Sequence, residues 1–161
     1  MFLSYKKAFL HEVPEKDRET FSIVNDVDVY PSDELYKKAY KLWKFVVERT
    51  GRYPVVIDGD ELAAYPDILL PKYFRKIGVP FRDSYLRWDD SQDVIRTWKT
   101  SYEAIVACAQ NGWITQAAFS DSFAPSLKLP PKREELSEDI RYCADVSMPY
   151  YRAMYKHRLK P

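Results

Sequence analysis

The sequence predicts a single-domain α/β fold over residues 1–161, predominantly helical with a short parallel sheet. Three patterns favour it: an amphipathic helix at 33–50, an apolar run at 54–58, and a second helical pattern from about 60 to 77. A strand between two helices is typical of a sheet covered on both faces. With 46% hydrophobic residues, the 161-residue chain can bury a sizeable core.

The first thirty residues carry shorter patterns. Four apolar residues recur at helical spacing and predict a short opening helix: Phe2, Tyr5, Phe9 and Leu10. The charged, proline-containing stretch that follows has the composition of a loop, and residues 21–30 could hold a short strand.

The helix at 33–50 has signals at both ends. Ser32 is a candidate N-cap, because its hydroxyl can accept a backbone N–H, and Asp33 and Glu34 suit the positive end of the helix dipole. Gly51 stands where a left-handed residue ends many helices. The apolar stripe of this helix consists of Leu35, Ala39, Leu42, Trp43, Val46 and Val47.

Residues Val55–Ile57 are apolar at consecutive positions, which predicts a strand that is covered on both faces. Helical spacing returns at 66–77 and stops at Gly78. Pro71 falls inside this segment, where a proline is expected to kink or split a helix.

The second half shows no clear strand. Residues 91–110 have the pattern of a helix that ends at Asn111 and Gly112, and 123–134 is a proline-punctuated linker. A pair of helices, divided near Pro149, is predicted to close the chain.

Charge and cysteine content limit the function classes. The 25 basic and 24 acidic residues argue against a global attraction to nucleic acid or anionic membranes, although a local patch stays open. No apolar run reaches the ~18 residues of a membrane span. Cys108 and Cys143 are far apart in sequence, which favours reduced thiols and a cytoplasmic location.

Three acids, Asp58, Asp60 and Glu61, surround Gly59 directly after the apolar run. A calcium loop would need further ligands, and position 62 is already leucine, so no metal site is predicted. The favoured interpretation is that Asp58 ends the strand, Gly59 turns the chain, and Asp60 caps the next helix.

Histidines and basic residues offer no clear catalytic pattern. His11 and His157 are interpreted as surface residues without a nucleophile at a catalytic spacing. The C-terminal YYRAMYKHRLKP alternates tyrosines and cations, as in some nucleic-acid sites. Its three- and four-residue apolar spacing fits a half-buried helix better, so no nucleic-acid partner is expected.

The stretch 55–81, VVIDGDELAAYPDILLPKYFRKIGVPF, resembles the sulfotransferase family, which has a strand, an acidic turn, a helix and a Gly-Val-Pro-Phe-like end. Tyr65 departs from the family, which usually has aspartate before this proline. The matching positions are Asp58, Asp60, Leu62, Pro66, Ile77, Gly78, Val79, Pro80 and Phe81. The resemblance implies a partial three-layer P-loop-type fold.

The resemblance also implies a donor, 3′-phosphoadenosine 5′-phosphosulfate, and a hydroxyl or amine acceptor of unknown identity. Residues 2–9 resemble the end of a family motif in which Ser4 would hold the 3′-phosphate of this donor. The phosphosulfate-binding loop would precede Met1, and the chain contains no GxxxxGK[ST] sequence. Because that loop supplies most of the catalytic electrostatics, the chain alone is expected to be inactive, with no catalytic residue of its own.

A non-enzymatic protein-interaction module that keeps half of the fold is the alternative. Cutting a parallel sheet exposes a strand edge, which a partner chain or a missing N-terminal segment would have to cover. A third hypothesis is an unrelated helical domain that binds nucleic acid through its C-terminal tyrosines and cations.

Overall fold

The computed structural model describes five stretches of the chain: residues 1–10, 13–26, 32–88, 120–123 and 131–161. The helix predicted at 91–110, most of the linker predicted at 123–134, His11 and Cys108 lie outside them.

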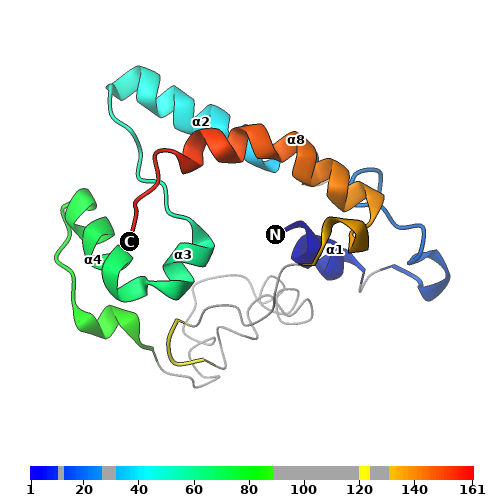
Figure 1. Cartoon of the computed structure of the whole chain (residues 1–161), viewed down its shortest axis with the longest axis horizontal. Helices are drawn as coiled ribbons and strands as arrows, with labels where there is room; N and C mark the ends of the chain where they lie inside the picture. The colour runs from blue at the N-terminus through cyan, green and yellow to red at the C-terminus, as the bar shows by residue number, and fades with distance from the viewer. Residues whose placement is uncertain (11–12, 27–31, 89–119, 124–130) are drawn as a thin grey trace.

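The described part is built from helices (Figure 1). The two longest, α2 (Leu35–Thr50) and α8 (Glu138–Tyr155), lie side by side. Three shorter α-helices lie below them in Figure 1: α1 (Phe2–Phe9), α3 (Gly59–Ala64) and α4 (Pro66–Ile77). Single turns of 3₁₀-helix connect them: η1 (Glu15–Asp17), η2 (Ser32–Glu34), η3 (Asp83–Leu86) and η4 (Arg133–Glu135).

The predicted α/β fold is wrong, because the described residues form no sheet. The apolar run Val55–Ile57 is extended, but it makes a one-residue parallel bridge from Val56 to Arg158, just after α8. The Leu159 N–H donates to the Val56 carbonyl at 2.8 Å. A second one-residue bridge joins Arg87 to Ser122. The three-layer P-loop-type arrangement and its vacant sheet edge are therefore absent from the described part.

Aromatic side chains join α2 to α8. Tyr36 meets Tyr151 edge to face with 5.7 Å between ring centroids, and Tyr40 meets Tyr150 at 5.6 Å. Such pairs add about 0.5–1.5 kcal/mol beyond the area they bury. The predicted division of the last helix is wrong, because α8 runs without a break through Pro149.

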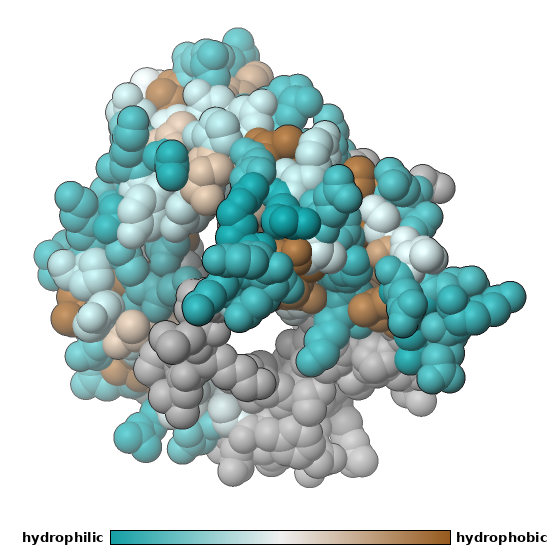
Figure 2. All heavy atoms as spheres, turned by 45° about the vertical axis from the view of Figure 1, so that its right-hand side comes forward, coloured by the Kyte–Doolittle hydropathy of each residue, from teal (hydrophilic) through white to brown (hydrophobic). Residues whose placement is uncertain are grey.

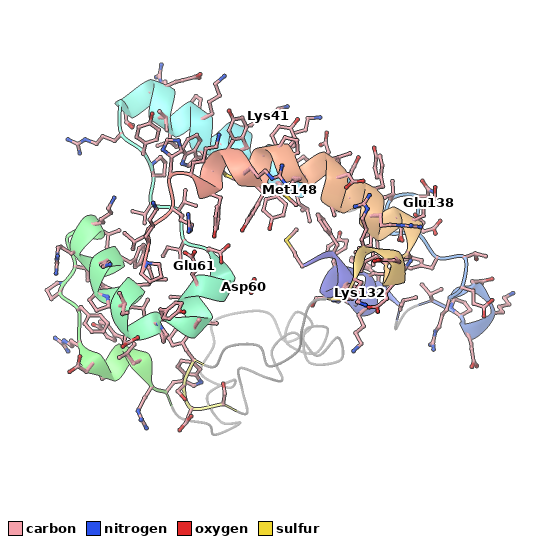
Figure 3. The ribbon with its side chains drawn as sticks, viewed as in Figure 1. Lys41, Asp60, Glu61, Lys132, Glu138 and Met148 are labelled. Carbon is pink, nitrogen blue, oxygen red and sulfur yellow. The ribbon has the colours of Figure 1, made fainter. Side chains whose placement is uncertain are left out.

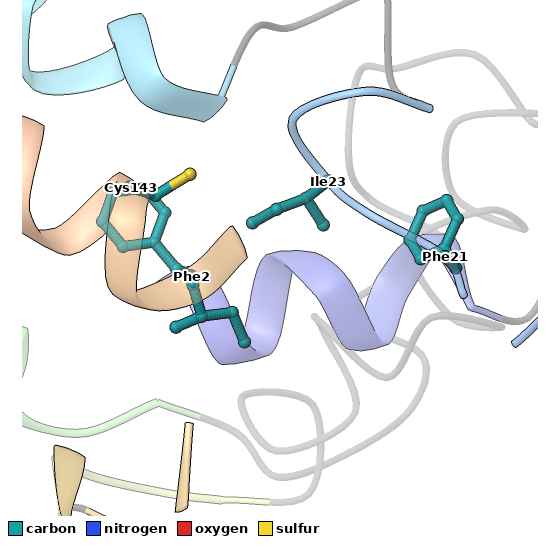
Figure 4. Close-up of a cluster of buried hydrophobic side chains, with 5 residues drawn as sticks. Phe2, Phe21, Ile23 and Cys143 are labelled. Carbon is teal, nitrogen blue, oxygen red and sulfur yellow. The ribbon is translucent and has the colours of Figure 1, made fainter. Parts of the chain in front are cut away.

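The main hydrophobic core lies where α1 meets the first half of α8 (Figure 4). A turn at residues 21–26, where the sequence suggested a strand, closes it from the side. Its buried residues are Phe2, Phe21, Ile23, Ile140 and Cys143. Fully burying an aliphatic or phenyl side chain contributes about 1.5–3 kcal/mol, so this small cluster anchors both helices.

Glycines end two helices as predicted. Gly51 follows α2 with a φ of 65°, and Gly78 follows α4 with a φ of 73°, both in the left-handed region. The first helix after the apolar run starts earlier than predicted, because Asp58 rather than Asp60 is its N-cap. The chain breaks between α3 and α4 at Tyr65, and α4 continues through Pro71.

None of the helices in the described ranges combines the length and the apolar content that crossing a membrane requires. The face in Figure 2 is mostly hydrophilic, and its hydrophobic residues form small separate groups.

Candidate functional site

Asp58 connects α3 to α8 through both of its carboxylate oxygens. Oδ1 accepts the backbone N–H groups of Asp60 and Glu61, each at 3.1 Å, and so caps α3. Oδ2 accepts the hydroxyl of Tyr151 on α8 at 2.9 Å. The cap that the sequence predicted as a local feature is therefore also a tertiary contact.

Glu61 makes a second connection to the end of α8. Its carboxylate forms an ion pair with Arg158 Nη2 at 2.8 Å. It also accepts hydrogen bonds from Arg158 Nε at 2.9 Å and from the Tyr155 hydroxyl at 3.1 Å. The Arg158 guanidinium also lies 3.6 Å above the Tyr155 ring. The hydrogen bonds from Arg158, more than that from Tyr155, hold the pKa of Glu61 below its usual value although desolvation opposes them. Glu61 is thus engaged in structure and is not available as a base.

A cavity of about 410 Å³ lies between α1, α3 and α8. Asp60 on α3 and Met148 on α8 lie on opposite sides of it (Figure 3). Its wall consists of Met1, Phe2, Tyr36, Asp58, Gly59, Asp60, Ala144, Ser147, Met148 and Tyr151. No lysine, arginine or histidine is among these lining residues, and the cation in the wall is the N-terminal ammonium group of Met1. We refer to it as the acidic cavity.

Two tyrosines in the wall of the acidic cavity have hydroxyl groups with raised pKa values. Burial raises the pKa of the Tyr151 hydroxyl, and the hydrogen bond to Asp58 raises it further. Burial also raises the pKa of Tyr36, with additional contributions from the charges of Asp58 and Asp60. Burial, the larger cause for both tyrosines, disfavours any charge in the cavity, whereas the smaller contribution of the carboxylates disfavours a phenolate and favours a cation.

Ser147 supplies a buried polar group in the wall of the acidic cavity. The residue is 2% exposed, and its Oγ has no hydrogen-bond partner among the described residues. A buried hydroxyl without a partner costs free energy, so such groups in proteins call for an explanation. A polar ligand in the cavity would supply the missing contact once the serine side chain rotates toward it.

A smaller cavity of about 160 Å³ adjoins the acidic cavity. The two share Tyr36, Asp58, Gly59 and Tyr151 in their walls. The smaller one adds an apolar end, with Val56, Ile57 and Met154 in its lining. The combined wall is charged at the α3 side and hydrophobic elsewhere.

A third cavity, of about 530 Å³, lies at the other end of α8. Two of its four charged residues form an ion pair, with 2.9 Å between Lys6 Nζ and Asp139 Oδ2, and the other two are Glu19 and Glu138. Asp139 also accepts the backbone N–H of Ile23 at 3.0 Å and the hydroxyl of Ser137. Because these groups satisfy one another, Lys6 and Asp139 join α1, the turn at residues 21–26 and α8 structurally.

Ser4, the serine expected to hold a donor phosphate, lies on the exposed side of α1. It lines none of the three cavities above. The donor-binding role of Ser4 remains a prediction. Among the described residues, no three histidine, cysteine or acidic side chains are grouped as metal ligands would be.

Sequence reasoning singled out Asp58 and Asp60 but missed Tyr36, Ser147 and Tyr151, which complete the acidic cavity. The spacing Ser147, Tyr151 and Tyr155 places all three on one face of a helix, which is the signal that could have drawn attention to them.

The chain was compared with family models, curated proteins and solved structures, and none of them matches it.

Proposed function

We propose that the chain is a non-enzymatic binding module that captures a positively charged alkylammonium group in the acidic cavity. The observation that carries this proposal is the pairing of Asp58 and Asp60 on α3 with the tyrosine rings of α2 and α8 around one cavity. The alternative predicted from the sequence was a protein-interaction module that keeps half of the fold. The present proposal shares only its non-enzymatic binding role, because the half-sheet is absent from the described residues.

The wall suits both ends of such a ligand. Carboxylates attract the ammonium group, and aromatic rings within about 6 Å of a cation add about 0.5–2 kcal/mol. The alkyl part of the ligand meets hydrophobic surface, because Phe2 and Met148 also line the cavity. A lysine side chain of a partner protein and a small free amine share this chemistry.

Sulfuryl transfer is the other function predicted from the sequence, and it remains a prediction. Its donor carries several negative charges, which the carboxylates of Asp58 and Asp60 would repel in this cavity. Thermal unfolding with and without adenosine 3′,5′-diphosphate tests the sulfuryl-transfer prediction separately. A ligand at about 100 times its dissociation constant adds about 2.7 kcal/mol to the free energy of unfolding, and an unchanged melt counts against a donor site.

The test of the binding module is a titration of protein with ¹³C-methyl-labelled methionine, followed at the Met148 methyl resonance. We expect n-butylammonium to shift this resonance saturably and butyrate, which has the opposite charge, to leave it in place. A lysine-containing peptide and the free amine are titrated in parallel to distinguish a protein partner from a small ligand. No response to either cation would overturn the proposal.

Asp60→Asn is the matched variant, because it removes the charge and keeps the side-chain shape. Asp60 is exposed, and its side chain accepts no hydrogen bond from α8 among the described residues. We expect ammonium binding to weaken about fivefold, which corresponds to about 1 kcal/mol. Asp67→Asn is the control: it removes an exposed acid from the first turn of α4, outside the cavity wall. Equal weakening by both variants would assign the effect to general charge.

A further inference from the structure

The outer side of α2 combines cations with two large exposed hydrophobic side chains. Leu42 is 66% exposed and Phe45 is 58% exposed, and they are one helical turn apart. Both lie on the side of α2 opposite to Tyr36 and Tyr40, whose rings pack on α8. We call this side the basic–apolar face, and its other members are Lys38, Lys41 and Arg49.

The basic–apolar face carries three basic residues, and one acid, Glu48, lies at its edge. Lys44 pairs with Glu48 at 3.5 Å, and Lys38 pairs with Glu34 at 3.3 Å from the preceding turn. Such exposed pairs are worth little and exchange readily for other anions. Lys41 has no ion pair within the described part and points away from α3 (Figure 3). The face therefore keeps a positive charge although the whole chain is nearly neutral.

The placement of α2 leaves this face open. The helix forms the outer edge of the described structure, with α8 on its inner side (Figure 1). No residue of α2 is fully buried, although the helix is sixteen residues long and amphipathic. The main apolar stripe of α2 packs on α8. Its exposed side adds a leucine and a phenylalanine beside cations, and these residue types also occur in helices at a membrane interface.

From this geometry we propose that the basic–apolar face of α2 docks on a bilayer surface that contains anionic phospholipids. Leu42 and Phe45 enter the boundary between headgroups and acyl chains, and the surrounding cations contact lipid phosphates. Charge complementarity selects this occupant over a second copy of the chain, because two such faces would place like charges opposite each other. This contact is peripheral and independent of the acidic cavity.

The test is co-sedimentation of the full chain with vesicles of phosphatidylcholine alone or with roughly one third phosphatidylserine. We expect binding to the anionic vesicles at low salt, little binding to the neutral ones, and a marked loss at high salt because exposed charges are screened. Absence of binding to the anionic vesicles at low salt would overturn the proposal, as would equal binding to both vesicle types.

Two sets of variants separate the two contributions. Leu42→Gln with Phe45→Gln is expected to abolish sedimentation while leaving the melting temperature unchanged, since both side chains are exposed. Lys38, Lys41 and Arg49 changed together to Gln should weaken binding about a hundredfold, given about fivefold for each cation at an anionic surface. Leu3→Gln with Ile77→Gln is the control, because it removes two other exposed apolar groups, from α1 and α4.

Further binding experiments identify the source of the anion and distinguish the membrane proposal from the ammonium-binding proposal. Binding of an oligonucleotide or of inorganic phosphate that depends on Lys41, with no binding to vesicles, would overturn the bilayer assignment. Asp60→Asn should sediment like the unmodified chain, and Leu42→Gln with Phe45→Gln should bind n-butylammonium normally. Either proposal can thus fail while the other stands.

Discussion

The Tyr151 hydroxyl donates a hydrogen bond to Asp58 Oδ2 over 2.9 Å, although the two residues are 93 positions apart. The same aspartate caps α3, so the start of that helix and the middle of α8 share one acceptor group. Hydrogen bonds at a shared acceptor act together, and breaking one of them changes the position of the other partner. The acidic cavity therefore depends on this contact for its shape as well as its charge.

Replacing Tyr151 with phenylalanine should lower the free energy of unfolding by about 1.5 kcal/mol. A hydrogen bond to a charged group contributes about 1.5–3 kcal/mol, and the lower end applies because both side chains are only half-buried. Urea denaturation measures the change. Tyr53→Phe is the control, since the Tyr53 ring is exposed and is held by stacking on His157. Equal losses in the two variants would show that the Tyr151 hydroxyl makes no specific contribution.

Raising the pH should remove the same stabilisation. The pKa of Tyr151 in the folded protein lies above the ordinary value of 10.0, mainly through burial and then through Asp58. Above pH 10.0 the unfolded chain loses the phenolic proton first, so stability from this group is complete below that pH and declines as the pH rises. The difference in the free energy of unfolding between Tyr151→Phe and the unmodified chain should therefore be smaller above pH 10.0 than at neutral pH. Denaturation curves at both pH values measure it. A constant difference across this range would contradict the assignment.

Local signals predicted the elements that depend on local chemistry. Gly51 and Gly78 end their helices because a left-handed residue costs glycine little, which is visible in the sequence alone. The helix that became α2 was predicted from periodicity, and only its first turn differs. In contrast, Pro149 was expected to divide the last helix, and the packing of α8 against α2 outweighs that preference.

Long-range pairing could not be predicted in the same way. Three consecutive apolar residues at Val55–Ile57 indicate an extended segment shielded from water, but they do not name its partner. The partner is Arg158, which follows α8, and a single bridge to it replaces the expected sheet. Asp58 and Tyr151 pose the same problem, because no spacing rule links an acid and a tyrosine so far apart. The sequence therefore predicted the acidic residues of the candidate site but not the aromatic residues of its wall.

Lys6→Met should destabilise the fold by about 2 kcal/mol at neutral pH. The Lys6 and Asp139 side chains are only 15% and 8% exposed, and removing one member of a largely buried ion pair leaves the other charge uncompensated. Chemical denaturation gives the difference. Lys7→Met is the matched control, because Lys7 is the exposed neighbour on the same helix. A similar loss from both variants would contradict a structural role for this pair.

At acid pH, Lys6→Met and the unmodified chain should have the same free energy of unfolding. Burial raises the pKa of Asp139, but hydrogen bonds from Ser137, Ile23 and Lys6 outweigh it and lower the pKa below 3.8. The stabilisation is complete above the unfolded value of 3.8 and is lost as the pH falls through the folded pKa. Denaturation curves measured below pH 3.8 should converge for the two proteins. Curves that stay equally separated there would mean that Lys6 acts without Asp139.

Alanine at two glycines should change stability in opposite directions. Gly78 has a φ of 73°, where alanine is strained, and nothing lies within 4 Å of an added Cβ, so we expect a pure backbone loss of about 1 kcal/mol. Gly59 has equal space but an ordinary backbone at the start of α3, and alanine there should gain about 0.4–1 kcal/mol. Each acts as the control for the other in thermal and urea denaturation. A loss at Gly59 as large as that at Gly78 would show that the space beside α3 is occupied by other parts of the chain in solution.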